Sequence, residues 1–136
     1  MVSFDVNLIG VAAAGIGAFI LGFLWYGPLF GKRWMALTGK TMKDMESSKG
    51  NMPLYMLGGL VSALVTSYVL GVFLVSLGAL AMGDALFVAF LAWLGFQAML
   101  LVGDILWEAK PVALFVLNAA YQLVALLLMA TIITII

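Results

Sequence analysis

Four long runs without a charged residue divide the chain, covering residues 6–31, 50–83, 85–103 and 111–136. A helix needs about 20 apolar residues to span the hydrocarbon core of a bilayer. A segment in lipid must satisfy its own backbone hydrogen bonds, which favours helices, and these runs lack the alternating polar pattern of a barrel strand. The pattern therefore predicts transmembrane helices near residues 6–27, 54–77, 84–107 and 111–134.

The segment between the first two predicted helices, residues 28–53, is more polar. Pro28 ends the first apolar run, and two sets of side chains then recur at helical spacing. One set is apolar and the other mostly basic: Phe30, Trp34 and Leu37 against Lys32, Ala36, Lys40 and Lys43. This predicts a short amphipathic helix in the membrane interface, the alternative being a solvated loop whose charges only set the topology. Residues 44–52 are predicted to be a polar linker, and Pro53 suits a helix start.

The composition supports the same fold class. Hydrophobic residues make up 66% of the 136 residues and charged residues 9%, where a soluble domain has about 25% charged residues. The mean hydropathy is +1.25. We therefore expect an all-α membrane protein, with residues 1–136 forming a single four-helix transmembrane bundle and the short interfacial helix following the first span.

The same composition excludes several kinds of function. Six basic and six acidic residues cancel, so no net field attracts nucleic acid. The chain has no Cys and no His, which removes thiol nucleophiles and the commonest metal ligands and general bases. We therefore expect no metal site, no cofactor and no enzymatic activity.

The basic residues are distributed one-sidedly. The first loop contains Lys32, Arg33, Lys40, Lys43 and Lys49, and the third contains Lys110. Both termini and the second loop contain none. Because Lys and Arg accumulate in cytoplasmic loops, loops 28–53 and 108–110 are predicted to be cytoplasmic and both termini outside. The predicted location is the plasma (inner) membrane, crossed several times.

Small residues recur every four positions on the first two predicted helices. The two stripes are Gly10, Ala14, Ala18 and Gly22, and Gly59, Ala63, Ser67 and Gly71. Four-residue spacing puts each set on one helix face, where small side chains let another backbone approach closely. The stripes are interpreted first as packing surfaces within the chain, and second as the contact surface of a homo-oligomer.

A few polar residues lie within the predicted spans. Gln97, Asp104 and Glu108 are seven and four positions apart and are expected to share a face of the third helix. Asn118 and Gln122 are one turn apart on the fourth, and Gln97 and Gln122 fall at similar depth, within reach of a hydrogen bond. Because ionisable residues in spans are functional candidates by default, these five residues are a candidate polar path or ligand cleft.

The structural alternative for these residues is a packing network. It consists of amide hydrogen bonds between helices, with Asp104 and Glu108 paired to Lys32, Arg33 or Lys110 at the inner surface. Such amide bonds contribute about 0.6–2 kcal/mol each. No charge is predicted near the midplane, which argues against a proton-coupled transporter. Asp84, at the start of the third helix, is predicted to be its N-cap.

Four aromatic residues, Trp25, Tyr26, Trp34 and Trp107, cluster at the predicted inner interface. Aromatic side chains commonly anchor a protein at the level of the lipid headgroups, and we expect that role here. The alternative is an aromatic cage for a cationic ligand.

Two blocks of sequence resemble an uncharacterised family of small membrane proteins, domain of unknown function 1761. They are LGFLWYGPLFGKRWMALTG at residues 21–39 and LWEAKPVALFVLNAAYQLV at residues 106–124. In the first block an aromatic-Gly-Pro segment runs into a basic pair, which is an uncommon combination. The resemblance implies a similar size and helix number. It implies no reaction, ligand or partner.

Three functional hypotheses follow. The first is a non-enzymatic bundle that acts through contacts with membrane lipids and with copies of itself. The second is a small channel or transporter whose polar path lies between the third and fourth helices. The third is an intramembrane enzyme acting on a lipid, in which Asp104 and Glu108 serve as acid and base or hold Mg²⁺.

Overall fold

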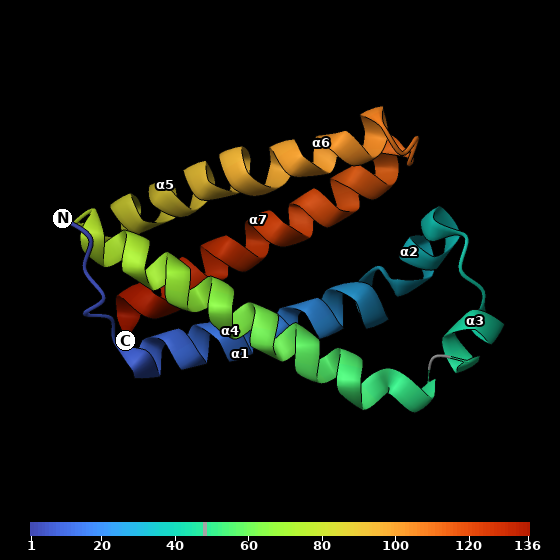
Figure 1. Cartoon of the computed structure of the whole chain (residues 1–136), viewed down its shortest axis with the longest axis horizontal. Helices are drawn as coiled ribbons and strands as arrows, with labels where there is room; N and C mark the ends of the chain where they lie inside the picture. The colour runs from blue at the N-terminus through green and yellow to red at the C-terminus, as the bar shows by residue number, and fades with distance from the viewer. Residues whose placement is uncertain (48) are drawn as a thin grey trace.

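A computed structural model describes residues 1–47 and 49–136, and these are helical apart from short connections and the chain ends. The long helices are α1 (Leu8–Leu24), α4 (Met52–Ser76), α5 (Met82–Trp93) continued by α6 (Met99–Leu106), and α7 (Val112–Ile135). Two short helices, α2 (Gly31–Thr38) and α3 (Met42–Ser47), lie between α1 and α4 (Figure 1). The described residues include no strand, so the predicted fold class is confirmed.

Among the described residues, four helical segments are long and apolar enough to cross a membrane: Leu8–Leu29, Met52–Ser76, Met82–Leu106 and Val112–Ile135. Each has 22 to 25 residues. At ~1.5 Å per residue they measure about 33–38 Å, against ~30 Å of hydrocarbon. Their length and hydropathy identify the chain as a membrane protein.

The long helices pack as a row in which α1 and α7 are central. α1 lies between α4 and α7, and α7 lies between α1 and the α5–α6 helix. The outer members, α4 and α5–α6, meet near the turn that joins α4 to α5 and diverge toward the other end of the molecule (Figure 1). The expected bundle is therefore open along the side between α4 and α5–α6.

Both small-residue stripes lie in contacts within the chain. On α1, a Cβ added at Gly10 would lie 3.7 Å from the Ile133 Cα atom of α7. On α4, Gly59 lies against the Phe19 ring and Gly71 against Val11, both on α1. The remaining stripe residues are Ala14, Ala18 and Ser67, which are completely buried, and Gly22 and Ala63, which are partly buried. The stripe of α4 therefore faces α1, and the ends of the α1 stripe face α7.

Among the glycines of α1, the tightest contact with α4 is at Gly15, one residue away from the α1 stripe. A Cβ there would lie 2.7 Å from Leu64 Cδ2 and 3.0 Å from Leu64 Cα. The Ser67 hydroxyl donates a 2.7 Å hydrogen bond to the Val11 carbonyl across the same contact. This pair of helices is thus fixed by close backbone contact and one buried hydrogen bond.

The polar linker predicted at residues 44–52 is wrong at its start, because Met42–Ser47 forms α3. The cause is a reciprocal cap at its N-terminus. The Asp44 carboxylate accepts from the Thr41 N–H at 2.9 Å, and the Thr41 hydroxyl accepts from the Asp44 N–H at 3.2 Å. The Thr41 N–H bond lowers the pKa of Asp44. The rest of the predicted linker includes one turn of 3₁₀ helix, Lys49–Asn51.

The N-cap predicted for the third span is also wrong. α5 begins at Met82 with Ala81 as its N-cap, and Asp84 lies inside the first turn. A carboxylate at that position still faces the positive end of the helix dipole, so the residue suits the helix start by charge without capping it.

The two chain ends lie at one end of the molecule, beside the turn between α4 and α5 (Figure 1). The N-terminal segment is held there by Ser76, whose hydroxyl accepts from the Ser3 N–H at 2.8 Å. We call this the terminal end. The opposite end contains α2, α3 and the turn between α6 and α7, and therefore the Lys and Arg residues of both loops; we call it the basic end.

Candidate functional site

Two π-helical turns interrupt the spanning helices, Trp25–Leu29 in the first span and Leu94–Ala98 in the third. In the first, the Phe30 N–H donates to the Trp25 carbonyl at 2.9 Å. Pro28 explains it, because proline has no N–H for a regular helical bond. A Cβ at Gly31 would lie 2.8 Å from the Tyr26 carbonyl oxygen, so glycine is required after the turn. Turns of this kind are frequent at functional sites and redirect the side chains around them.

The first π-helical turn directs Tyr26 toward α7. Its hydroxyl donates a 2.7 Å hydrogen bond to the Asn118 Oδ1 atom. The Tyr26 ring meets the rings of Tyr121, at 5.2 Å, and Trp34, at 6.1 Å, edge to face. The Tyr121 hydroxyl donates to the Ala18 carbonyl at 3.3 Å. This interfacial cluster joins α1, α2 and α7 with hydrogen bonds and ring contacts.

The four predicted aromatic anchors differ in their surroundings. Trp25, Tyr26 and Trp34 are partly buried, and Trp25 contacts the Phe30 ring at 4.7 Å. Trp107 is 87% exposed. The Lys40 ammonium lies 4.9 Å from the centre of the Trp34 ring, so one of these rings already holds a cation of the chain itself.

Trp93, to which the sequence assigned no role, joins α5 to α7. Its indole N–H donates a 2.8 Å hydrogen bond to the Ala119 carbonyl, and its ring lies 5.7 Å from that of Phe90. No local sequence signal indicates this bond, because its acceptor is a main-chain group 26 residues away.

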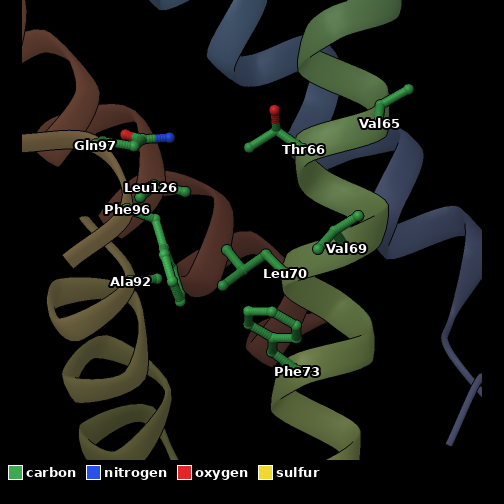
Figure 2. Close-up of a pocket in the computed structure, with 9 residues that line it drawn as sticks. All are labelled: Val65, Thr66, Val69, Leu70, Phe73, Ala92, Phe96, Gln97 and Leu126. Carbon is green, nitrogen blue, oxygen red and sulfur yellow. The ribbon is translucent and has the colours of Figure 1, made fainter. Parts of the chain in front are cut away.

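A pocket of about 420 Å³ lies between α4 and the α5–α6 helix (Figure 2). We call it the lateral pocket, and its lining residues are Val65, Thr66, Val69, Leu70, Phe73, Ala92, Phe96, Gln97 and Leu126. Figure 2 shows Thr66, Leu70 and Phe73 on the α4 side of the pocket, with Phe96 and Gln97 on the opposite side. Most of the lining is apolar, and much of it consists of side chains exposed on the membrane-facing surface.

Gln97 is the polar residue that stands out in the lateral pocket. It belongs to the second π-helical turn, and its Oε1 atom is buried with no hydrogen-bond partner. Thr66, the other polar residue of the lining, donates its hydroxyl hydrogen to the Ser62 carbonyl at 2.9 Å. In Figure 2 the amide nitrogen of Gln97 lies on the side toward α4, and the unpaired Oε1 atom lies on the other side of the same amide group.

The hydrogen bond that the sequence makes possible between Gln97 and Gln122 is not formed, since the Gln97 Oε1 atom is unpaired and the described residues show no bond from its amide nitrogen. Both side chains line a smaller pocket of about 210 Å³ instead. The π-helical turn explains the difference, because its extra residue changes the direction that a regular helix would give Gln97.

Glu108 does not share a helix face with Gln97 and Asp104, because α6 ends at Leu106. It lies in the following turn, where its carboxylate is 3.1 Å from the Lys110 ammonium; Asp104 lies 3.9 Å from the same group. The sequence offered Lys32, Arg33 and Lys110 as partners, and the salt bridges of the described residues are formed with Lys110. The hydrogen bond with Glu108, followed by the charge of Asp104, raises the pKa of Lys110.

Within the part of the chain that the structure describes, no group of three or more Asp or Glu side chains is arranged to hold a metal ion. The family model described as "Protein of unknown function (DUF1761)" matches residues 9–134, nearly the whole chain. No curated protein and no solved structure matches.

Proposed function

Since the chain belongs to the DUF1761 family of proteins of unknown function, we propose a function from its own geometry. We propose a non-enzymatic membrane protein that binds a small lipophilic molecule in the lateral pocket. The bound molecule has an apolar body and one hydrogen-bond donor, a hydroxyl or N–H group. The unpaired Gln97 Oε1 atom is the observation that carries this proposal.

The unpaired acceptor carries an energetic cost. Leaving a buried polar group without a partner costs about 1–3 kcal/mol, and lipid hydrocarbon contains no water to supply one. A half-turn about the terminal torsion of Gln97, which is broad and two-fold in amides, exchanges the nitrogen and the oxygen and brings the oxygen to the α4 side. A ligand donor there would recover part of that cost. The volume, about 420 Å³, lies in the range of small-molecule sites, roughly 300–1,000 Å³. The Phe, Val and Leu side chains of the lining suit an apolar body.

The proposal can be tested with a pair of probes that differ in one donor. The full chain in mild detergent is titrated with farnesol and with its methyl ether, which accepts but does not donate a hydrogen bond. We expect farnesol to bind about three- to tenfold more tightly, the effect of one hydrogen bond in an apolar medium. Gln97→Leu should abolish that preference, because it removes the acceptor and keeps a similar volume.

Gln122→Leu is the matched control, because Gln122 is also a partly buried glutamine but is not among the residues that line the lateral pocket. It should keep the preference for farnesol. Equal binding of the two probes to the unmodified chain would contradict the proposal. Native mass spectrometry could also show a dimer that does not bind farnesol. That result would contradict the proposal, because the lateral pocket would then be covered by a second copy of the chain.

A second candidate function is a small channel or transporter. It is favoured by polar side chains at successive depths of α7: Asn118 lines a pocket at the basic end, and Gln122 shares the 210 Å³ pocket with Gln97. Asn118→Ala and Asp104→Asn should then change the permeability of liposomes that contain the protein. Unchanged flux of ions and small polar solutes in both variants would remove this candidate.

We also propose that the basic end faces the cytoplasm of a cell bounded by its plasma (inner) membrane, with both termini outside. The support is the positive-inside rule. Because the sequence has no Cys, single-cysteine variants report accessibility without background. A membrane-impermeant maleimide added to intact cells should label Leu80→Cys at the terminal end and spare Glu46→Cys at the basic end. The reverse pattern would overturn the assignment.

A further inference from the structure

A second large pocket, of about 520 Å³, opens at the basic end where α2 approaches the turn between α6 and α7. We call it the basic-end pocket, and its lining residues are Trp34, Leu37, Thr38, Lys40, Ala109, Lys110, Pro111, Leu114 and Asn118. Trp34, Leu37 and Leu114 supply apolar walls, and Lys40 and Lys110 supply two exposed ammonium groups.

The side-chain groups that the basic-end pocket can offer are hydrogen-bond donors. Besides the two lysines, the Asn118 amide lines the pocket. Its oxygen already accepts a 2.7 Å hydrogen bond from the Tyr26 hydroxyl. That bond fixes which end of the amide is free, and the Asn118 Nδ2 group has no partner among the described residues. The Thr38 hydroxyl donates its hydrogen bond to the Trp34 carbonyl, at 2.9 Å.

We propose that the basic-end pocket binds an amphiphile with an anionic head. Lys40, Lys110 and Asn118 hold a phosphate or carboxylate group, and the apolar part of the molecule lies against Trp34, Leu37 and Leu114. A mixture of donors above apolar walls, at the level where spanning helices end, matches such a molecule. Its source is either an anionic phospholipid of the surrounding leaflet or a soluble phosphorylated or carboxylated compound. This inference is independent of the lateral pocket.

The carboxylates near this pocket make the proposal more specific. Glu108 lies 3.1 Å and Asp104 3.9 Å from the Lys110 ammonium, so an arriving anion competes with them for that cation. Removing the nearer carboxylate should therefore strengthen anion binding. If anions bound non-specifically to a basic surface, their affinity would not depend on a single neighbouring carboxylate.

The test uses the full chain in mild detergent and native mass spectrometry. The lipid arm compares short-chain phosphatidic acid with short-chain phosphatidylcholine, and the soluble arm uses inorganic phosphate. We expect phosphatidic acid to bind at least about tenfold more tightly than phosphatidylcholine, as charge-assisted hydrogen bonds permit. Lys40→Gln and Lys110→Gln should each weaken binding about three- to tenfold. Lys40→Arg keeps the positive charge and should bind phosphatidic acid about as tightly as the unmodified chain does. Glu108→Gln should strengthen binding by about threefold.

Lys32→Gln and Lys43→Gln are the matched controls, because they remove the same charge from the same loop without touching the pocket lining. They should change affinity by less than about twofold, since neither side chain lines the pocket and salt screens a charge that does not contact the bound anion. Equal losses in all four Lys→Gln variants would overturn the proposal, as would an unchanged affinity in Lys40→Gln and Lys110→Gln. Inorganic phosphate binding with the same variant pattern supports the site with a soluble source, whereas binding of phosphatidic acid alone supports it with a lipid source.

Discussion

Gly15→Ala should lower the free energy of unfolding by about 1–3 kcal/mol, the usual cost of forcing an extra carbon into a well-packed contact. The added Cβ would lie 2.7 Å from Leu64 Cδ2 and 3.0 Å from Leu64 Cα. The Leu64 side chain can rotate away, but its Cα atom moves only with α4, so the two helices must separate. Reversible unfolding in detergent mixtures, followed by the loss of helical circular dichroism, measures the change.

Gly58→Ala is the matched control for Gly15→Ala. It makes the same substitution in the interior of α4, where an added Cβ would meet no atom within 4 Å. Alanine is the better helix former by about 1 kcal/mol, so this variant should be neutral or slightly more stable. Equal destabilisation by the two substitutions would show that Gly15 is not at a close helix contact.

Trp93→Ala should also be strongly destabilising, by about 3 kcal/mol, the lower end of the range for truncating a packed aromatic side chain. It removes both the ring between α5 and α7 and the 2.8 Å hydrogen bond to the Ala119 carbonyl. Trp93→Phe keeps most of the ring and should cost about 1 kcal/mol, the net value of the bond alone. The same unfolding assay measures both.

Trp107→Ala is the matched tryptophan control. Trp107 is 87% exposed, so its removal should change the free energy of unfolding by less than about 0.5 kcal/mol. If the Trp107 variant lost as much stability as the Trp93 variant, the packing of α5 on α7 described above would be wrong.

The four spanning segments could be predicted from the sequence because they depend on length and hydropathy alone, which are local properties. The interruptions within them were harder to predict. Pro28 gives a local reason for the first π-helical turn, but Leu94–Ala98 contains no proline and belongs to an otherwise regular apolar run. The start of α5 was misplaced because Asp84 suits both an N-cap and a first helical turn.

The candidate site could be predicted only in part, since its important features join distant segments. Asn118 was singled out as a polar residue in a span, but its partner Tyr26 is 92 residues away. A hydrogen bond between Gln97 and Gln122 was possible from their depth alone; the two side chains line one pocket, but the Gln97 Oε1 atom is unpaired. The lateral pocket depends on the divergence of α4 from α5–α6, a property of the whole row of helices that no stretch of sequence records.

The small-residue stripes show how far a periodic pattern can be interpreted. Four-residue spacing indicates which face of α1 is small, and Ala14 and Ala18 on that face are completely buried. It does not indicate which helix covers the face. Among the glycines, the tightest contact lies at Gly15, one position outside the stripe, because α1 is packed on two sides at once.

The shared position of the two chain ends has a practical consequence (Figure 1). After an even number of crossings, the chain finishes on the surface from which it started. Two copies can therefore be concatenated in one polypeptide through a short polar tether, without an added crossing and with both halves inserted in the same sense. Pairing an altered half with an unaltered one would then reveal how many intact units an activity requires.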